Sequence, residues 1–256
     1  MERLGTKDYP WTENTEHQVE FIIKKLALTG QERILDLACG FGRHSISLAR
    51  KGFSVTGVDI NKRYIDDAIQ TAQELALDTT FICADIREII YQNEFDIVLN
   101  LDDGAIGYLE NDEENLKIFD VISKALKPGG KHFMGVNNAD YAESHFPENI
   151  CEIGSKMITI WQSYWVAEKR SMICVPYNIR YGEIAVKPPQ IDIENETAMR
   201  LYSLTELEQI FQQRGMKIAA SFANYTDKKS SNKNLVLYRD TERFTKAKKC
   251  NKISHR

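Results

Sequence analysis

Strand-like and helix-like stretches alternate along residues 30–138 of the chain. The strand-like stretches are short and mostly apolar, and they are RILDL (33–37), FSVTGVD (53–59), TTFICAD (79–85), FDIVLNL (95–101) and KHFMGVNN (131–138). Between them, apolar residues recur at helical spacing in 43–52, 61–77, 86–91 and 111–130. This alternation predicts an α/β fold with a doubly wound, mostly parallel sheet, because each parallel connection needs a crossover.

The pattern changes after residue 139. Residues 156–184 alternate apolar and polar residues and carry many aromatic ones, which predicts two or three antiparallel strands. A helix at 203–215 and two further strands then resume the first pattern. We therefore expect three regions, which are an N-terminal helical cover at 1–29, a sheet domain at 30–240 with an antiparallel β insertion at about 139–200, and a basic tail at 241–256.

Composition narrows the class of protein but not its chemistry. The chain has 256 residues, 43% of them hydrophobic and 27% charged, with a formal net charge of −4, as in ordinary soluble globular proteins. This charge gives no reason to expect nucleic-acid binding by the domain. The tail is interpreted as solvated, with an anionic partner as the alternative. No apolar run approaches the roughly 18 residues of a membrane span. The five cysteines form no Cys-x-x-Cys pair, which favours a reducing cytoplasm.

Polar residues gather where the predicted strands end. Asp36, Asp59, Asp85 and Asn100 each close such a run, and a turn containing Gly40 and Gly42 follows the first. Ligands of parallel sheets bind at this carboxyl edge, and glycine lets a ligand approach the backbone closely. A dinucleotide would need a third glycine in the pattern G-x-G-x-x-G. Ser45 stands at that place, so the sequence disfavours a dinucleotide site.

The spacing Asp36-x-Ala38-x-Gly40-x-Gly42 resembles motif I of the class I S-adenosylmethionine-dependent methyltransferases, with Ala38 in place of the first glycine. Further motifs follow in the family's order across residues 30–240, and they are GVDIN, CADIRE, FDIVLNLDDGAIGYL, ALKPGGKHFMGV and MRLYSLTELEQIFQQRGMKI. The resemblance implies a seven-stranded Rossmann-like sheet and an enzyme of the bacterial small-molecule type, with S-adenosylmethionine as co-substrate.

The resemblance also implies roles for single residues. Asp59 would bind the ribose hydroxyls, Asp85 the adenine amino group, and Asp36 would face the methionine part. Alternatives stay open, since Asp59 or Asp85 could cap a following helix, and Tyr9 or Trp11 could be a structural anchor rather than a cover for the co-substrate. His44 is expected in the first turn of a helix near the ligand, with a catalytic base as the alternative. The full set of expected co-substrate contacts is Tyr9, Trp11, Asp36, Ala38, Gly40, Gly42, His44, Asp59, Ile60, Asp85, Ile86, Asn100 and Leu101.

Catalytic residues are harder to predict, because methyl transfer from a sulfonium depends mainly on positioning. Asp102, Asp103 and Tyr108, in the loop after the fourth strand, are candidates, although Asp-Asp-Gly is also ordinary turn chemistry. Asp102 after the fourth strand and Asn137–Asn138 after the fifth strand resemble, in their positions, the metal-binding residues of the Mg-binding catechol O-methyltransferases. The second aspartate is absent, so no metal is expected.

The aromatic side chains of the insertion are expected either to form a wall of the pocket for the methyl acceptor, or to pack in a core or against a dimer partner. We expect transfer of a methyl group to an O or N atom of a small molecule by in-line displacement, with no nucleic acid or membrane partner and with homodimerisation open. A non-catalytic protein that binds S-adenosylmethionine and a nicotinamide-dependent dehydrogenase are the alternatives.

Overall fold

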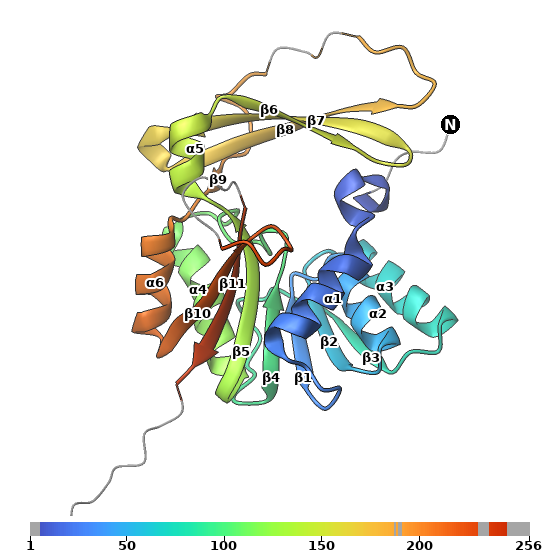
Figure 1. The fold of residues 1–256 in the computed structure, drawn as a ribbon, viewed down its shortest axis with the longest axis vertical. Coiled ribbons are helices and arrows are strands. Elements are labelled where there is room, and N and C mark those ends of the chain that lie inside the picture. Colours follow the sequence, from blue (N-terminus) through green and yellow to red (C-terminus); the bar gives the residue numbers. More distant parts are fainter. Residues whose placement is uncertain (1–5, 187, 189–190, 230–235, 245–256) are drawn as a thin grey trace, which may run out of the picture.

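The fold is described from a computed structural model, which covers residues 6–186, 188, 191–229 and 236–244. Its centre is a seven-stranded sheet with the order β10-β11-β5-β4-β1-β2-β3 (Figure 1). The five strands from β5 to β3 in this order run parallel, whereas β11 is antiparallel to both of its neighbours. The strands are β1 (Arg33–Leu37), β2 (Ser54–Asp59), β3 (Thr79–Cys83), β4 (Phe95–Asn100), β5 (Leu126–Asn137), β10 (Met216–Ala223) and β11 (Val236–Arg243).

Helices cover both faces of this sheet because its strands are apolar on both. In β1, Ile34 packs against one core cluster and Leu35 against the other, and both are fully buried. Burying a side chain of this size stabilises the fold by about 1.5–3 kcal/mol. One cluster is closed by α1 (Thr15–Leu26) and α2 (Arg43–Arg50), with α3 (Lys62–Glu74) beside α2. The opposite cluster is closed by α4 (Asp112–Ala125) and α6 (Leu204–Gln213). The doubly wound fold predicted from the sequence is confirmed.

Local signals at helix ends explain most element boundaries. Asn61 caps α3 by accepting hydrogen bonds from the backbone N–H groups of Arg63 and Tyr64. Ser203 caps α6 in a reciprocal box with Glu206. The helix expected at 86–91 is wrong. That segment makes a single turn, in which Glu88 N–H donates to the carbonyl of Asp85 at 3.0 Å. Its β-branched isoleucines and its length disfavour helix nucleation.

The insertion forms a second, antiparallel sheet that lies over the carboxyl ends of the parallel strands (Figure 1). It begins with α5 (Ala139–His145), which the sequence pattern did not reveal, and its strands are β6 (Glu148–Ile153), β7 (Met157–Val166), β8 (Ser171–Arg180) and β9 (Met199–Arg200). The chain enters and leaves it at one place. Asn138 pairs with Tyr202 in an isolated parallel bridge, and Ala139 N–H donates to the Tyr202 carbonyl at 3.3 Å.

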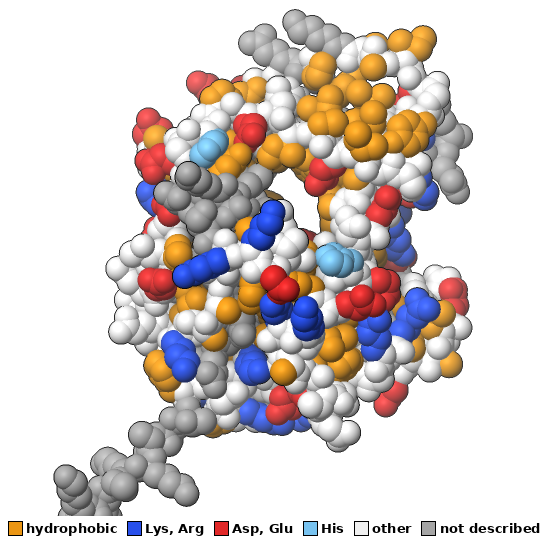
Figure 2. Space-filling view, in the orientation of Figure 1, with side chains coloured by type: hydrophobic (Ala, Val, Ile, Leu, Met, Phe, Trp, Pro, Cys, Tyr) orange, Lys and Arg blue, Asp and Glu red, His pale blue; other side chains and the backbone are white. Residues whose placement is uncertain are grey.

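One face of the four-stranded sheet looks toward the larger sheet. On this face Trp161 donates to Glu152, and Ser163 contacts Cys174. Tyr9 stacks on Trp161 with ring centroids 5.9 Å apart, and its hydroxyl accepts a hydrogen bond from Asn178. Tyr9 immediately precedes η2 (Pro10–Thr12), which leads into α1, so the N-terminal segment reaches from the larger sheet to this face. Figure 2 shows an opening between the two parts.

Three observations concern the ends and the surface. β11 continues to Arg243, so the first residues of the expected basic tail belong to a strand, and residues 245–256 lie outside the described part. Within the described residues, every helix is too short or too polar to cross a bilayer. Cys39, Cys83, Cys151 and Cys174 are free thiols, and Cys250 lies outside the described residues.

Candidate active site

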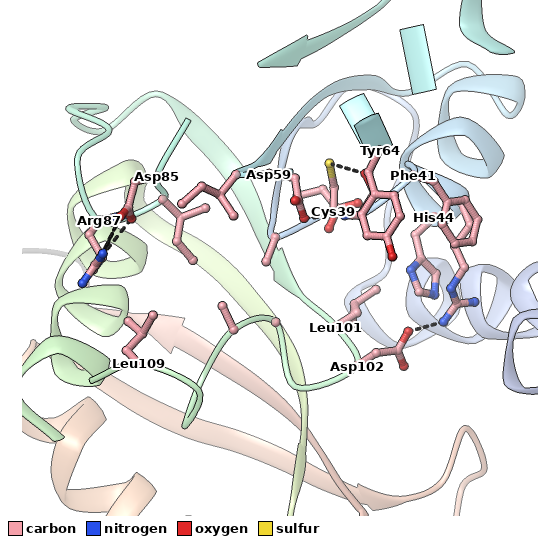
Figure 3. A pocket seen from close by; sticks show the side chains of 18 of the residues that line it. Cys39, Phe41, His44, Asp59, Tyr64, Asp85, Arg87, Leu101, Asp102 and Leu109 are labelled. Carbon is pink, nitrogen blue, oxygen red and sulfur yellow. Dashed lines mark hydrogen bonds and ion pairs between the residues drawn. The ribbon is translucent and has the colours of Figure 1, made fainter. Parts of the chain in front are cut away.

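A cavity of about 330 Å³ opens at the carboxyl ends of the parallel strands (Figure 3). Its walls come from the residues that follow four adjacent strands, together with Trp11 from the N-terminal segment. The lining residues are Trp11, Asp36, Ala38, Cys39, Gly40, Phe41, Arg43, His44, Asp59, Ile60, Tyr64, Asp85, Ile86, Arg87, Leu101, Asp102, Gly104, Ala105 and Leu109.

The order of strands in the sheet sets the order of acids along the cavity. Asp85 follows β3, Asp59 ends β2, Asp36 lies in β1 and Asp102 follows β4, and these strands are neighbours in the order β3-β2-β1-β4. Three spacings of about 4.8 Å each give a row roughly 14 Å long. In Figure 3, Asp85, Asp59 and Asp102 follow one another across the cavity. The site is therefore an elongated groove with an acid at each step.

Asp59 is 9% exposed, and its carboxylate binds the backbone of the turn after β1 and of the segment that leads into α3. Its Oδ2 accepts the backbone N–H of Gly40 at 2.8 Å, and its Oδ1 accepts the backbone N–H of Asn61 at 2.8 Å. A carboxylate has about four acceptor positions, two on each oxygen. The remaining position on each oxygen is available to a ligand, so Asp59 suits a pair of neighbouring hydroxyl groups.

The turn between β1 and α2 depends on a left-handed backbone. Ala38, Gly40 and Gly42 have φ angles of 54°, 56° and 75°. A Cβ added at Gly40 would meet open space, whereas one at Gly42 would lie 2.8 Å from the ring of Phe81. Gly40 thus faces the cavity, and Gly42 lets α2 pack on β3. Ala38 holds a conformation that costs an L-residue roughly 1–2 kcal/mol, which the surrounding turn must offset.

Asp36 is buried among other charges beneath the cavity. It is 2% exposed, and its Oδ2 accepts a hydrogen bond from Ser45 Oγ at 2.6 Å. Burial raises the pKa of Asp36 to about 7, because the charged form loses its hydration and neighbouring Asp59 and Asp102 repel it. The hydrogen bond from Ser45 and the charge of Arg43 oppose this rise. Asp36 therefore titrates near neutral pH and would be held ionised by a cationic ligand.

Asp85 and Arg87 form a closed ion pair at one end of the cavity. Arg87 Nε and Nη2 donate to both carboxylate oxygens at 2.6–3.0 Å, and the Arg87 backbone N–H donates to Oδ1 at 2.8 Å. These bonds lower the pKa of Asp85 below its ordinary value. Arg87 Nη1 also reaches Glu110 and Glu114. Since these bonds occupy most acceptor positions of Asp85, a ligand amino group would share the carboxylate with Arg87.

Arg43 joins three separate segments at the opposite end. Its Nη1 donates to Thr15 Oγ1 at 2.7 Å and to Gln18 Oε1 at 2.6 Å, and its Nη2 pairs with Asp102. The guanidinium also lies over the indole of Trp11, 5.1 Å from the ring centroid. Its side chain is only 8% exposed. A buried charge of this kind requires partners, and here the partners tie the N-terminal cover to the loop after β4.

His44 lies next to this network in the first turn of α2. It is 5% exposed, and its Nε2 contacts Gln18 Oε1 at 2.9 Å. Burial and the charge of Arg43 hold the pKa of His44 well below its ordinary value. The ring is therefore neutral at physiological pH and acts as a donor to Gln18. Whether it touches a substrate stays a prediction.

The loop after β4 is strained. Asp102, Asp103 and Ala105 have positive φ angles of 51°, 67° and 66°, which L-residues rarely adopt. The loop is held from within by Asn100, whose amide donates to the Gly104 carbonyl at 2.9 Å, and by Asn115, which accepts the Gly107 N–H at 2.8 Å. Strain that the surroundings enforce is typical of functional loops.

Asp103 turns away from the elongated cavity. Its carboxylate accepts hydrogen bonds at 3.0–3.1 Å from the backbone and side-chain N–H groups of Asn137 at the end of β5. Burial raises the pKa of Asp103 to about 7, and the charge of Asp102 adds to this. Partial desolvation raises the pKa of Tyr108, and Asp103 and Cys174 raise it further. Neither Asp103 nor Tyr108 lines the elongated cavity.

Most of the predicted site residues converge on this cavity, and five do not line it. Asn100 and Gly42 brace it from behind, Tyr9 contacts the four-stranded sheet, Asp103 is bonded to Asn137 at the end of β5, and Tyr108 belongs to the loop after β4. Their contact with ligands stays a prediction. Lining residues that the sequence analysis did not single out for this site are Cys39, Phe41, Arg43, Tyr64, Arg87, Gly104, Ala105 and Leu109. Arg43 and Arg87 could have been suspected, because each follows a motif aspartate closely in the chain.

Among residues 6–186, 188, 191–229 and 236–244, no group of three or more His, Cys, Asp or Glu side chains is arranged to hold a metal ion. The acids of the cavity are instead spaced along its length and bonded to backbone N–H groups, Ser45 or arginines.

Comparison with known proteins shows the family to which this chain belongs. Residues 34–130 match the family described as Methyltransferase domain. YqeM of Bacillus subtilis (strain 168), which is named as a methyltransferase, is 30% identical over 209 residues, covering 80% of this chain and 81% of that protein.

Solved structures share the whole fold. An S-adenosylmethionine-dependent methyltransferase from Clostridium acetobutylicum ATCC 824 superposes with a TM-score of 0.69 at 18% identity, covering 90% of this chain and 92% of that one. The CcbJ methyltransferase from Streptomyces caelestis gives a TM-score of 0.73 at 14% identity, covering 93% and 94%. The chain therefore belongs to the class I S-adenosylmethionine-dependent methyltransferases, with S-adenosylmethionine as its co-substrate.

Proposed function

We propose that this enzyme transfers the methyl group of S-adenosylmethionine to an oxygen or nitrogen atom of a small molecule bound between the two sheets. The observation that carries the proposal is the row of acids from Asp85 through Asp59 to Asp36, which follows the sheet order. Asp85 takes the adenine amino group, Asp59 takes the ribose hydroxyls through its two free acceptor positions, and Asp36 faces the sulfonium.

The acceptor occupies the space between the seven-stranded and the four-stranded sheet, where Figure 2 shows an opening. Tyr108 and Asp103 belong to the loop after β4, and Cys174 belongs to β8 of the four-stranded sheet. Trp161 lies on the same face of that sheet. An aromatic side chain such as Trp161 beside the acceptor suits a planar or apolar molecule.

Transfer requires one bond to form while another breaks. The acceptor lone pair bonds to the methyl carbon, and the electron pair of the carbon–sulfur bond stays on sulfur, which becomes a neutral thioether. An O–H or N–H acceptor also loses a proton. Asp103 is the base that we assign to this proton, because its pKa of about 7 keeps it half ionised near neutral pH. Tyr108 orients the acceptor beside it.

A screen with methyl-labelled S-adenosylmethionine tests this function. The protein is incubated with small phenols, carboxylic acids and amines, and label transfer is measured between pH 5.5 and 9. We expect the rate to rise with pH through about 7 in the wild type. Asp103→Asn should lose that dependence and fall about 100-fold or more. Glu113→Gln, an exposed acid on α4, is the matched control.

Two outcomes would contradict the proposal. Tight binding of S-adenosylmethionine without methylation of any small acceptor would argue against a small-molecule enzyme. An unchanged pH profile in Asp103→Asn would refute the assignment of Asp103 as the base. It would leave the proposed methyl transfer itself untouched.

A further inference from the structure

We propose that the outer face of the four-stranded sheet is a contact surface for a second copy of this chain. The two copies meet outer face to outer face about a two-fold axis. This face belongs to β6, β7 and β8 and looks away from the seven-stranded sheet (Figure 1). The inference is therefore independent of the reaction proposed above and of the ligand that the cavity binds.

The strand register decides which side chains face outward. Successive side chains of a strand point to opposite faces, and residues paired across antiparallel strands share a face. Trp161 stacks on Tyr9 of the N-terminal segment, so it marks the inner face. Its neighbour Ile160 therefore points outward. Two paired rows cross the outer face, and they are Ile153–Ile158–Ile179 and Cys151–Ile160–Tyr177.

Charge is distributed over the two faces in the reverse of the usual way. An antiparallel sheet with one face in water normally carries its polar side chains on that face. Here Glu148, Glu152 and Arg180 share the inner face with Trp161. The structure describes every residue of β6, β7 and β8, and none of their outward positions holds Asp, Glu, Lys or Arg. The outer face is thus built like a surface that becomes covered.

The segment after β8 enlarges this apolar surface. The Tyr177 hydroxyl donates to the Val186 carbonyl at 2.6 Å, so the segment is bonded to the outer face. Ile153, Ile184 and Val186 are 74%, 90% and 66% exposed. Figure 2 shows apolar side chains gathered at this end of the sheet, away from α5. Contiguous apolar patches of more than a few hundred Å² are rare on monomers and mark interaction sites.

The absence of charge on this face favours a second copy as the occupant. In a two-fold contact each surface meets itself, so a charge near the axis would be buried against a charge of the same sign. A face without charges avoids this repulsion entirely. A partner of another kind would tolerate charges here, because it could carry the opposite ones. The uniformly uncharged rows of β6, β7 and β8 therefore suit self-association.

The size of the face sets the expected strength of the contact. Strands about 4.8 Å apart and ten residues long in β7 and β8 give a face of about 14 by 33 Å, or roughly 460 Å². The segment at 181–186 adds to this area. A standard interface buries about 800 Å² on each partner, and smaller ones belong to weaker contacts. We therefore expect a dimer that dissociates in the micromolar range.

Sedimentation velocity of the full chain between about 1 and 200 μM measures the dissociation constant. Ile160→Lys and Ile153→Lys should each weaken the wild-type dimer about tenfold or more, because a charge is then buried in the contact. Ile153 is already mostly exposed, so its substitution leaves the fold of the subunit intact. Ile90→Lys is the matched control, since Ile90 is 89% exposed and lies outside the four-stranded sheet.

Thiol labelling locates the contact. Cys151 belongs to the outer face, whereas Cys83 is an exposed thiol at the end of β3. The protein is treated with N-ethylmaleimide below and above the dissociation constant, and mass spectrometry follows each cysteine. Cys151 should react several-fold more slowly at the higher concentration, and Cys83 should react at the same rate at both.

Three results would overturn the inference. One is a wild type that stays monomeric at the highest concentration. Another is a dimer in which Cys151 is not protected and Ile160→Lys has no effect, since its interface then lies elsewhere. The third is an equal loss of association in Ile90→Lys, which would reflect added charge in general and not this face.

Discussion

Gly40 donates its backbone N–H to the carboxylate of Asp59 across 2.8 Å, so the turn after β1 is fixed by the residue that ends β2. One side chain thereby shapes the cavity and offers its remaining acceptor positions to a ligand. The same carboxylate also accepts the N–H of Asn61 at the start of α3. Under the proposed function, structure and binding depend on the same atoms of Asp59, which makes it the most informative residue to change.

Asp59→Ala should abolish detectable binding of S-adenosylmethionine and lower the free energy of unfolding by about 1–3 kcal/mol, because two backbone donors lose their acceptor. Calorimetry and urea titration measure the two effects. Asp66→Ala, an exposed acid on α3, should change neither by more than about 0.5 kcal/mol. Full binding by the Asp59 variant would refute the ribose assignment.

Asp36→Asn should stabilise the free protein above pH 7. The pKa of Asp36 is about 7 in the folded state and about 3.9 in an unfolded chain. Between these values the folded state holds the extra proton, so the wild type loses about 1.4 kcal/mol per pH unit as pH rises. The variant escapes this loss. Urea midpoints of the two proteins should therefore be similar at pH 4, diverge up to about pH 7 and keep a constant difference above it; a constant difference across the whole range would count against a raised pKa.

Asp85→Asn should reduce the preference for adenine over hypoxanthine. The wild-type carboxylate accepts from an amino group but repels a carbonyl oxygen, whereas an amide can also donate to that oxygen. We expect the wild type to bind S-adenosylhomocysteine about 10- to 100-fold more tightly than its inosine analogue, and the variant to narrow this gap. Equal ratios in the two proteins would place the adenine elsewhere.

Ser203→Ala should weaken the fold without affecting the site. Ser203 Oγ accepts the N–H of Glu206, and the Glu206 carboxylate accepts the N–H of Ser203 at 2.8 Å. Loss of such a cap costs about 1 kcal/mol. α6 covers the face opposite to α1 and α2, so the affinity for S-adenosylhomocysteine should stay unchanged. Thr205→Ala, on the exposed side of the same helix, serves as the comparison.

The row of acids could be predicted from sequence for a simple physical reason. Parallel strands that are buried on both faces are apolar at nearly every position, without an alternation of apolar and polar residues. All parallel strands end at the same edge of the sheet, so Asp36 and Asp59 were expected to lie together there. The short segment after Asp85 could not be predicted in the same way. Six residues give too few positions to separate a helix from a single turn, and the β-branched isoleucines in this segment disfavour a helix.

The contacts of Arg43 were beyond the reach of sequence patterns. They join residues separated by 25 to 59 positions, and each partner alone is an ordinary polar residue. The alternation that predicted antiparallel strands in the insertion likewise gave no sign of α5, whose short span carries little periodicity. Long-range side-chain geometry follows from the packed fold and not from local propensity.

The bridge between Asn138 and Tyr202 has a wider consequence. The insertion is joined to the larger sheet at this bridge, between the end of β5 and the start of α6. The insertion can therefore be altered or exchanged while the cavity at the carboxyl ends of the parallel strands keeps its form. One methyl-donating core can thus have served many chemistries over the course of evolution, each defined by what was attached there.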